Sequence, residues 1–245
     1  MAKREYPPVR MRATVYRDVR ASTRLRRLDR SLTPRIFASS FDFGIAEANQ
    51  TLTTEPIMAF GSTRYYKTSG MLRAKLRDVG WTSVDIGNHA LSVNEPSTIA
   101  IVTCSGDEHV GIDDPLAPEP QPRNPKGLLI KRAVERNIAV QQSLADEAPD
   151  AGFPHAVEAG HGEGEDQPWV TWVFIYTQDP LTGEPRAELS LPDELCLVGS
   201  QGHVTITGWV ERIFIESFST GPGKGRMGDV EDGGPTEVVV ERRVG

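Results

Sequence analysis

The stretch TIAIVTC at residues 98–104 constrains the fold most, because it is a short, largely apolar segment rich in β-branched residues. A short run of this kind is typical of a strand buried inside a sheet. The chain has 245 residues, which is long enough to bury a substantial core around such a strand. We therefore expect a folded domain whose sheet contains residues 98–104 as a central strand.

Other segments carry weaker periodic signals. Residues 9–16 alternate between apolar and polar side chains, which predicts a half-buried strand with a cationic outer face. Leu25, Leu28 and Leu32 fall at helical spacing, and Pro34 is expected to end that helix. Residues 41–56 show no firm hydrophobic period, and residues 57–60 fit a short strand. Residues 68–79 fit a helix that ends at Gly80, which would serve as its C-terminal cap.

The second half of the chain is richer in predicted strands. Residues 81–94 fit a hairpin that turns at Gly87–Asn88, and the pair Asn124–Pro125 is expected to begin a helix that reaches about Leu144. Residues 169–177 and 186–191 flank the turn-former DPLTGEP and should pair as a hairpin, and residues 203–207 and 209–217 add strands.

These segments predict one α+β domain with a mixed or largely antiparallel sheet, two or three packed helices and a β-rich C-terminal third. Residues 1–35 form a basic strand-helix segment, packed on the body or extending from it, and residues 36–218 form the body. Residues 146–168 have seven acidic residues and no lysine or arginine, which indicates an exposed, mobile loop. Residues 219–245 are expected to be a glycine-rich linker with an edge strand over 236–244.

The charge of the chain is divided unevenly. Residues 1–35 have eleven lysines and arginines against three acidic residues, a net charge of +8, so the other 210 residues carry −15. A basic segment on an acidic body either folds back onto that body or meets an external polyanion, such as nucleic acid or an acidic protein surface. The residues predicted to contact such a partner are Arg10, Arg12, Arg24, Arg26, Arg27 and Arg30.

The loop that follows the central strand, Ser105–Asp114, is the other candidate site. Asp107, Glu108 and His109 are candidate catalytic residues, and Asp107, Asp113 and Asp114 are candidate oxygen ligands for a divalent metal. Cys104 or Ser105 would serve as a nucleophile only beside a base. The alternative is that the chain turns at Gly106–Asp107 and that the carboxylates are solvated, since their spacing matches no known metal or triad motif.

Three further features indicate no site. His155 and His161 are too widely spaced in a glycine-rich acidic loop to indicate zinc, and the glycines of GPGKGRMGD precede no helix that could receive a phosphate. Cys104 and Cys196 lie among apolar residues, which predicts buried, reduced thiols, with a single disulfide as the alternative. The longest apolar run, residues 172–176, is far too short to cross a membrane. The basic N-terminus also lacks the apolar segment of a secretory signal. We therefore expect a cytoplasmic protein without a membrane partner.

Two functions follow as expectations from the sequence. The first is a non-enzymatic binding or assembly protein whose basic N-terminal segment contacts nucleic acid or an acidic protein. The alternative is a small metal-assisted hydrolase or phosphoryl-transfer enzyme that uses the Ser105–Asp114 loop.

Overall fold

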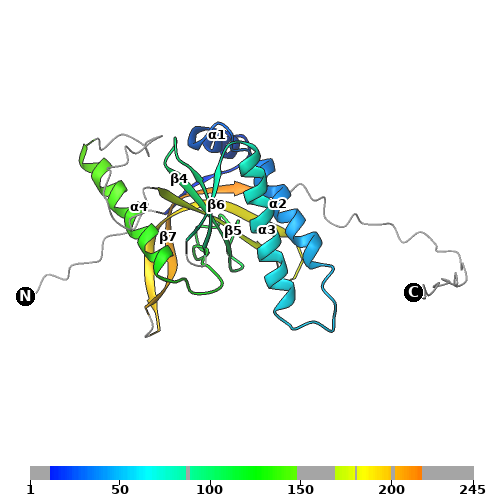
Figure 1. The fold of residues 1–245 in the computed structure, drawn as a ribbon. Helices are drawn as coiled ribbons and strands as arrows, with labels where there is room; N and C mark the ends of the chain where they lie inside the picture. The colour runs from blue at the N-terminus through cyan, green and yellow to red at the C-terminus, as the bar shows by residue number, and fades with distance from the viewer. Residues whose placement is uncertain (1–11, 87–88, 148–168, 180, 200–201, 217–245) are drawn as a thin grey trace, which may run out of the picture.

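The computed structural model describes residues 12–86, 89–147, 169–179, 181–199 and 202–216, and side chains are not described for residues 144–147. Over these residues it has an α+β fold, with helices and strands around one mixed sheet (Figure 1). The helices are α1 Asp18–Leu28, α2 Pro34–Ala48, α3 Ala59–Asp78 and α4 Leu128–Glu147. The strands are β1 Thr14–Tyr16, β2 Thr82–Ile86, β3 His89–Asn94, β4 Ile99–Ser105, β5 Val170–Gln178, β6 Pro185–Val198 and β7 His203–Ile215.

The sheet has the strand order β1-β7-β6-β5-β4-β3-β2. The pairs β4–β5 and β1–β7 are parallel, and the other neighbours are antiparallel. Parallel neighbours need a long crossover, and the segment between β4 and β5 contains α4. The prediction of a mixed sheet with residues 98–104 as a central strand is confirmed, and so are the hairpins β2–β3 and β5–β6.

Both faces of the sheet are covered. Helices α1, α2 and α3 lie on one face, and α4 lies on the other (Figure 1). Strand β5 shows why, because Trp172, Phe174 and Tyr176 belong to the core beneath α1–α3, whereas Val173 and Ile175 belong to the core beneath α4. A strand that is apolar on both faces is stable only between two such layers.

The first helices differ from the prediction. The helix α1 ends at Leu28, and Asp29 is extended; Leu32 is buried outside the helix, and Pro34 begins α2 instead of ending α1. Proline is favoured in the first turn of a helix because the amide that it lacks would have no partner there. The prediction that Pro34 ends the first helix was therefore wrong, and the helix α2 was missed.

The helix α3 is longer than predicted, and it includes part of the segment 57–60 that was expected to be a strand. It begins at Ala59 and pairs with α2 through a close approach at Gly44, where a Cβ atom would lie 2.9 Å from the carbonyl oxygen of Arg64. Gly80 follows the helix with φ +94°, a left-handed conformation that closes a helix well. The α2–α3 contact places the first half of α3 beside the carboxyl end of β4.

The helix α4 begins later than expected. Lys126 pairs with Val204 as an isolated bridge, with backbone N–O distances of 2.6 and 2.9 Å, so the chain is still extended where Asn124–Pro125 was expected to start the helix. The helix reaches Glu147, so residues 146 and 147 are helical rather than part of the predicted loop 146–168. The rest of that loop and residues 219–245 lie outside the described residues.

Both cysteines are free, and Cys196 is exposed rather than buried. No helix in the described part of the chain is long and apolar enough to cross a membrane.

Candidate anion-binding site

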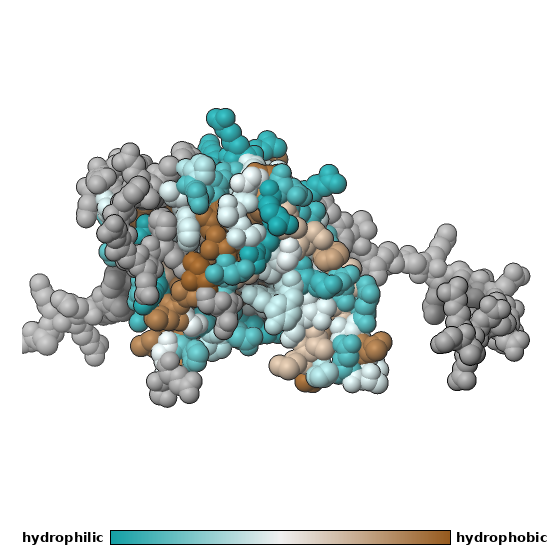
Figure 2. Space-filling model, viewed as in Figure 1, coloured by the Kyte–Doolittle hydropathy of each residue, from teal (hydrophilic) through white to brown (hydrophobic). Residues whose placement is uncertain are grey.

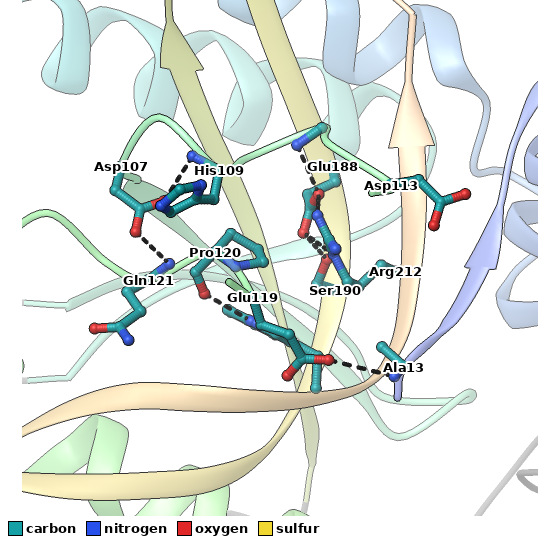
Figure 3. A network of polar contacts seen from close by, with 12 residues as sticks. Ala13, Asp107, His109, Asp113, Glu119, Pro120, Gln121, Glu188, Ser190 and Arg212 are labelled. Atoms are coloured by element: carbon teal, nitrogen blue, oxygen red, sulfur yellow. Dashed lines mark hydrogen bonds and ion pairs between the residues drawn. The ribbon is translucent and has the colours of Figure 1, made fainter. Parts of the chain in front are cut away.

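The loop after β4 uses its first carboxylate to hold its own backbone. Oδ1 of Asp107 accepts a hydrogen bond from the amide of His109, and Oδ2 accepts one from the amide of Gln121, each at 3.1 Å (Figure 3). Burial raises the pKa of Asp107, and the two amide hydrogen bonds partly oppose that shift. Asp107 therefore joins the two ends of the loop.

The structure keeps Glu108 and His109 next to Asp107, but it does not bring Asp113 to the same place. Asp113 lies well away from Asp107 (Figure 3), and it forms an exposed ion pair with Arg17 at 2.9 Å. Asp114 accepts a hydrogen bond from the amide of Leu116, and Glu108 is exposed beside His109. Within the described residues, no group of three or more histidines, cysteines or acidic residues has the arrangement of a metal site.

The same loop is fastened to the sheet by a buried polar cluster. The amide of Gly111 donates to Oε2 of Glu188 at 3.0 Å, and the guanidinium of Arg212 donates to both carboxylate oxygens of Glu188 at 2.9 and 2.7 Å (Figure 3). The hydroxyl of Ser190 donates to Oε1 at 2.8 Å. This cluster satisfies its charges internally, so it serves the fold rather than a ligand.

Several predicted N-terminal arginines are engaged within the chain. Arg24 is buried and donates to both carboxylate oxygens of Glu211 at 2.5 and 2.9 Å, and Arg12 donates to the carbonyl oxygens of Asp114 and Ala117. Arg27 is exposed and already has an interaction partner. Arg26 and Arg30 are exposed without an ion pair among the described residues, and Arg10 lies outside them.

A cavity of about 930 Å³ opens at the carboxyl end of the parallel pair β4–β5. The pairing of β4 with β3 stops at Val102, whereas its pairing with β5 continues to Ser105, so the last residues of β4 face the cavity instead of a neighbouring strand. Open α/β sheets commonly bind ligands at this edge. Its lining includes Cys104 and Ser105 but not Asp107, Glu108 or His109.

The cavity contains a buried guanidinium group that has no counterion in the described part of the chain. Arg64 lies on α3, is 7% exposed, and lines the cavity. Its Nη1 donates a long hydrogen bond of 3.4 Å to Gln178, its Nε has no hydrogen-bond partner, and no carboxylate among the described residues pairs with it. A buried guanidinium without a carboxylate partner costs free energy of folding unless a bound anion neutralises its charge.

Further positive groups line the same cavity. Arg123 and Lys126 contribute from the loop before α4, and the imidazole of His89, at the start of β3, lies beside them in the lining. Burial lowers the pKa of Arg64, and the charge of Arg123 lowers it further; burial lowers the pKa of His89, with Lys126 acting in the same direction. Arg64 and Arg123 are therefore close enough to repel one another, and the neutral form of His89 is favoured beside Lys126.

Asp179, the acidic residue among the described lining residues, already has hydrogen-bond and ion-pair partners. Asp179 accepts hydrogen bonds from the amides of Leu181 and Thr182, and its Oδ2 lies 2.9 Å from Nη2 of Arg186. The N-terminus of α4 adds positive potential, since Lys126 precedes its first turn and Ile130 within that turn lines the cavity. Among the described residues, the lining as a whole is therefore cationic.

Neutral polar groups surround this charge. Tyr176 is buried, and burial raises its pKa to about 12. The guanidinium of Arg64 lies 5.9 Å from the centroid of the Tyr176 ring, although Tyr176 is not one of the residues that line the cavity. Burial also raises the pKa of Cys104, which keeps the thiol protonated despite the nearby Lys126. The site therefore offers hydrogen-bond donors and positive charge rather than a thiolate nucleophile.

The sequence analysis missed Arg64, although its spacing could have revealed it. Arg64, Thr68, Leu72 and Leu76 form one row at i, i+4 spacing, and all four are buried. Extending the predicted helix backward along that row would have placed a cation on the face that meets the sheet. Comparison with known protein families, with curated proteins and with solved structures finds no match for this chain.

Proposed function

We propose that this protein is a binding protein for a small anionic ligand, which it holds in the cavity at the carboxyl end of β4 and β5. The observation that carries the proposal is Arg64, a buried cation that has no carboxylate partner among the described residues and lines a cationic cavity. An anion bound there would receive charge-assisted hydrogen bonds in a site of low dielectric constant. The volume of the cavity is within the range of small-molecule sites, roughly 300–1,000 Å³.

The first test removes the cation and keeps a side chain of similar length. Arg64→Met should abolish stabilisation by inorganic phosphate, pyrophosphate or citrate, which should raise the melting temperature of the wild-type protein by several degrees at saturation. The ligand-free variant should melt no lower than wild type, because methionine removes an uncompensated buried charge. Differential scanning calorimetry at constant ionic strength measures both effects.

The matched control is Arg77→Met, which removes an exposed arginine from the far end of the same helix. It should keep the full anion effect, and this separates specific binding from the general stabilisation that phosphate salts produce. An equal shift in wild type and Arg64→Met would overturn the proposal, and so would no shift with any of the three anions.

The basic N-terminal segment supports a second, weaker proposal of binding to nucleic acid. Arg26 and Arg30 are exposed on or just after α1, although Arg12 and Arg24 are held by the body. Affinity for duplex DNA should fall steeply with salt, and Arg26→Gln/Arg30→Gln should reduce the slope of log K against log [salt] by about 2 relative to Lys75→Gln/Arg77→Gln. Absence of DNA retention at low salt would remove this function.

The alternative of a metal-assisted hydrolase remains a prediction without support from the geometry of the loop. The carboxylate of Asp107 holds the loop, and Asp113 pairs with Arg17. A cytoplasmic location also stays a prediction.

A further inference from the structure

Aromatic side chains gather where the cavity meets the surface. Phe60, Tyr65 and Tyr66 all come from the first half of α3 and line the cavity. Tyr66 is 70% exposed, and its ring meets the ring of Tyr65 edge to face at 5.5 Å between centroids. The guanidinium of Arg64 lies 5.5 Å from the centroid of the Phe60 ring. The same helix therefore presents aromatic rings beside a buried cation.

Apolar residues extend this exposed end of the cavity. The turn between α2 and α3 exposes Ile57 and Met58, both of which line the cavity, and Leu52 nearby. Figure 2 shows hydrophobic residues at the lower right of the molecule, where Figure 1 places this turn. The cavity thus has an exposed aromatic end around Tyr66, and the buried guanidinium of Arg64 lies beside it.

The positive charge of the cavity lining favours a ligand with more than one negative charge. Arg64, Arg123 and Lys126 line the cavity, and the acidic residue in the described lining, Asp179, is already engaged. A phosphate monoester offers close to two negative charges near neutral pH and several acceptor oxygens that suit a planar guanidinium. A monocarboxylate would leave most of this positive charge unbalanced.

We propose that the ligand is a mononucleotide, with its phosphate at Arg64 and its base stacked on the aromatic end of the cavity. This inference rests on the proposed function, and it adds the chemical class of the ligand. Planar bases stack on tyrosine and phenylalanine rings largely irrespective of base identity. The aromatic end would therefore bind the base, and the cations would bind the phosphate.

The experiment compares ligands that differ by one part. The four ribonucleoside 5′-monophosphates, ribose 5-phosphate, adenosine and inorganic phosphate are titrated into the full-length protein by isothermal titration calorimetry. At least one nucleoside monophosphate should bind roughly ten-fold more tightly than ribose 5-phosphate, because only the nucleotide can stack. Adenosine should bind more weakly than its monophosphate, and Arg64→Met should remove that difference.

Paired variants test the aromatic end without changing the charge. Tyr65→Leu/Tyr66→Leu should reduce nucleotide affinity to that of ribose 5-phosphate and leave ribose 5-phosphate binding unchanged. The control Tyr65→Phe/Tyr66→Phe keeps both rings and should keep the nucleotide affinity within about two-fold. Circular dichroism melting confirms that each variant is folded, and Tyr66→Leu alone provides a milder change at an exposed position.

The outcomes separate the two proposals. If no nucleoside monophosphate binds more tightly than ribose 5-phosphate, the mononucleotide inference fails, while phosphate binding that depends on Arg64 keeps the proposed function. If the leucine pair leaves nucleotide affinity unchanged, stacking at Tyr65 and Tyr66 is also overturned. If no phosphate compound binds the wild-type protein, both proposals fail together.

Discussion

Glu188→Ala is expected to lower the free energy of unfolding by about 3–5 kcal/mol, since it leaves a buried arginine without its partner. Glu188 is fully buried on β6, and Arg212 on β7 is 5% exposed. The carboxylate accepts two hydrogen bonds from Arg212 and one each from Ser190 and Gly111. Its loss therefore leaves a buried cation unpaired and releases the loop after β4. Urea denaturation followed by circular dichroism measures the change.

A double variant separates the charge from the packing. Replacing both members of a buried ion pair with apolar residues of similar size is often neutral, so Glu188→Leu/Arg212→Met should recover most of the stability lost in Glu188→Ala. The control Glu184→Ala removes an exposed glutamate from the preceding turn and should change stability by no more than about 0.5 kcal/mol. A loss below about 1 kcal/mol for Glu188→Ala would show that the pair does not hold the loop.

Asn137→Leu is expected to lower the free energy of unfolding by at least about 3 kcal/mol. Asn137 lies in the middle of α4 and is fully buried. Its Nδ2 donates to the carbonyl oxygens of Thr171 at 2.9 Å and Pro192 at 3.2 Å, and its Oδ1 accepts from the amide of Thr171 at 2.9 Å. The leucine variant leaves three buried backbone groups without these bonds, and each unsatisfied group costs about 1–3 kcal/mol.

The control for this change is Gln142→Leu, which replaces an exposed amide on the same helix and should have little effect. Chemical denaturation of both variants gives the comparison. Equal stabilities for Asn137→Leu and Gln142→Leu would show that the side chain does not fasten α4 to β5 and β6. The first turn of α4 lines the proposed anion site. Because Asn137→Leu loosens this helix, it should also weaken phosphate binding.

The strands were predictable wherever a local pattern was enough to define them. The β-branched run of β4 and the turn-former between β5 and β6 gave the correct strands and the correct hairpin. The helix α2 was missed because its sequence, PRIFASSFDFGIAEA, mixes serine and glycine with apolar residues and shows no clear period. Gly44 is explained only by its contact with Arg64 and Thr68 of α3. Tertiary contact, rather than periodicity, fixes that helix.

The site was harder to predict than the fold. Local reading gave prominence to the acidic loop after β4, yet Asp107 holds that loop through the amides of His109 and Gln121. The cationic cavity assembles from α3, the end of β4 and the residues before α4, which only the sheet order brings together. Charge counting at the N-terminus likewise could not show that Arg24 is neutralised by Glu211.

The hydrogen bonds between Arg24 and Glu211 join residues 187 positions apart, and β1 pairs with β7 near that contact. During synthesis on the ribosome, α1 therefore emerges long before the strand that it covers, and its apolar residues Leu25 and Leu28 lack their final cover until β7 has been made. The first and last described elements must consequently fold in one late step, so a nascent chain that stops before β7 should be a client for chaperones rather than a partly finished domain.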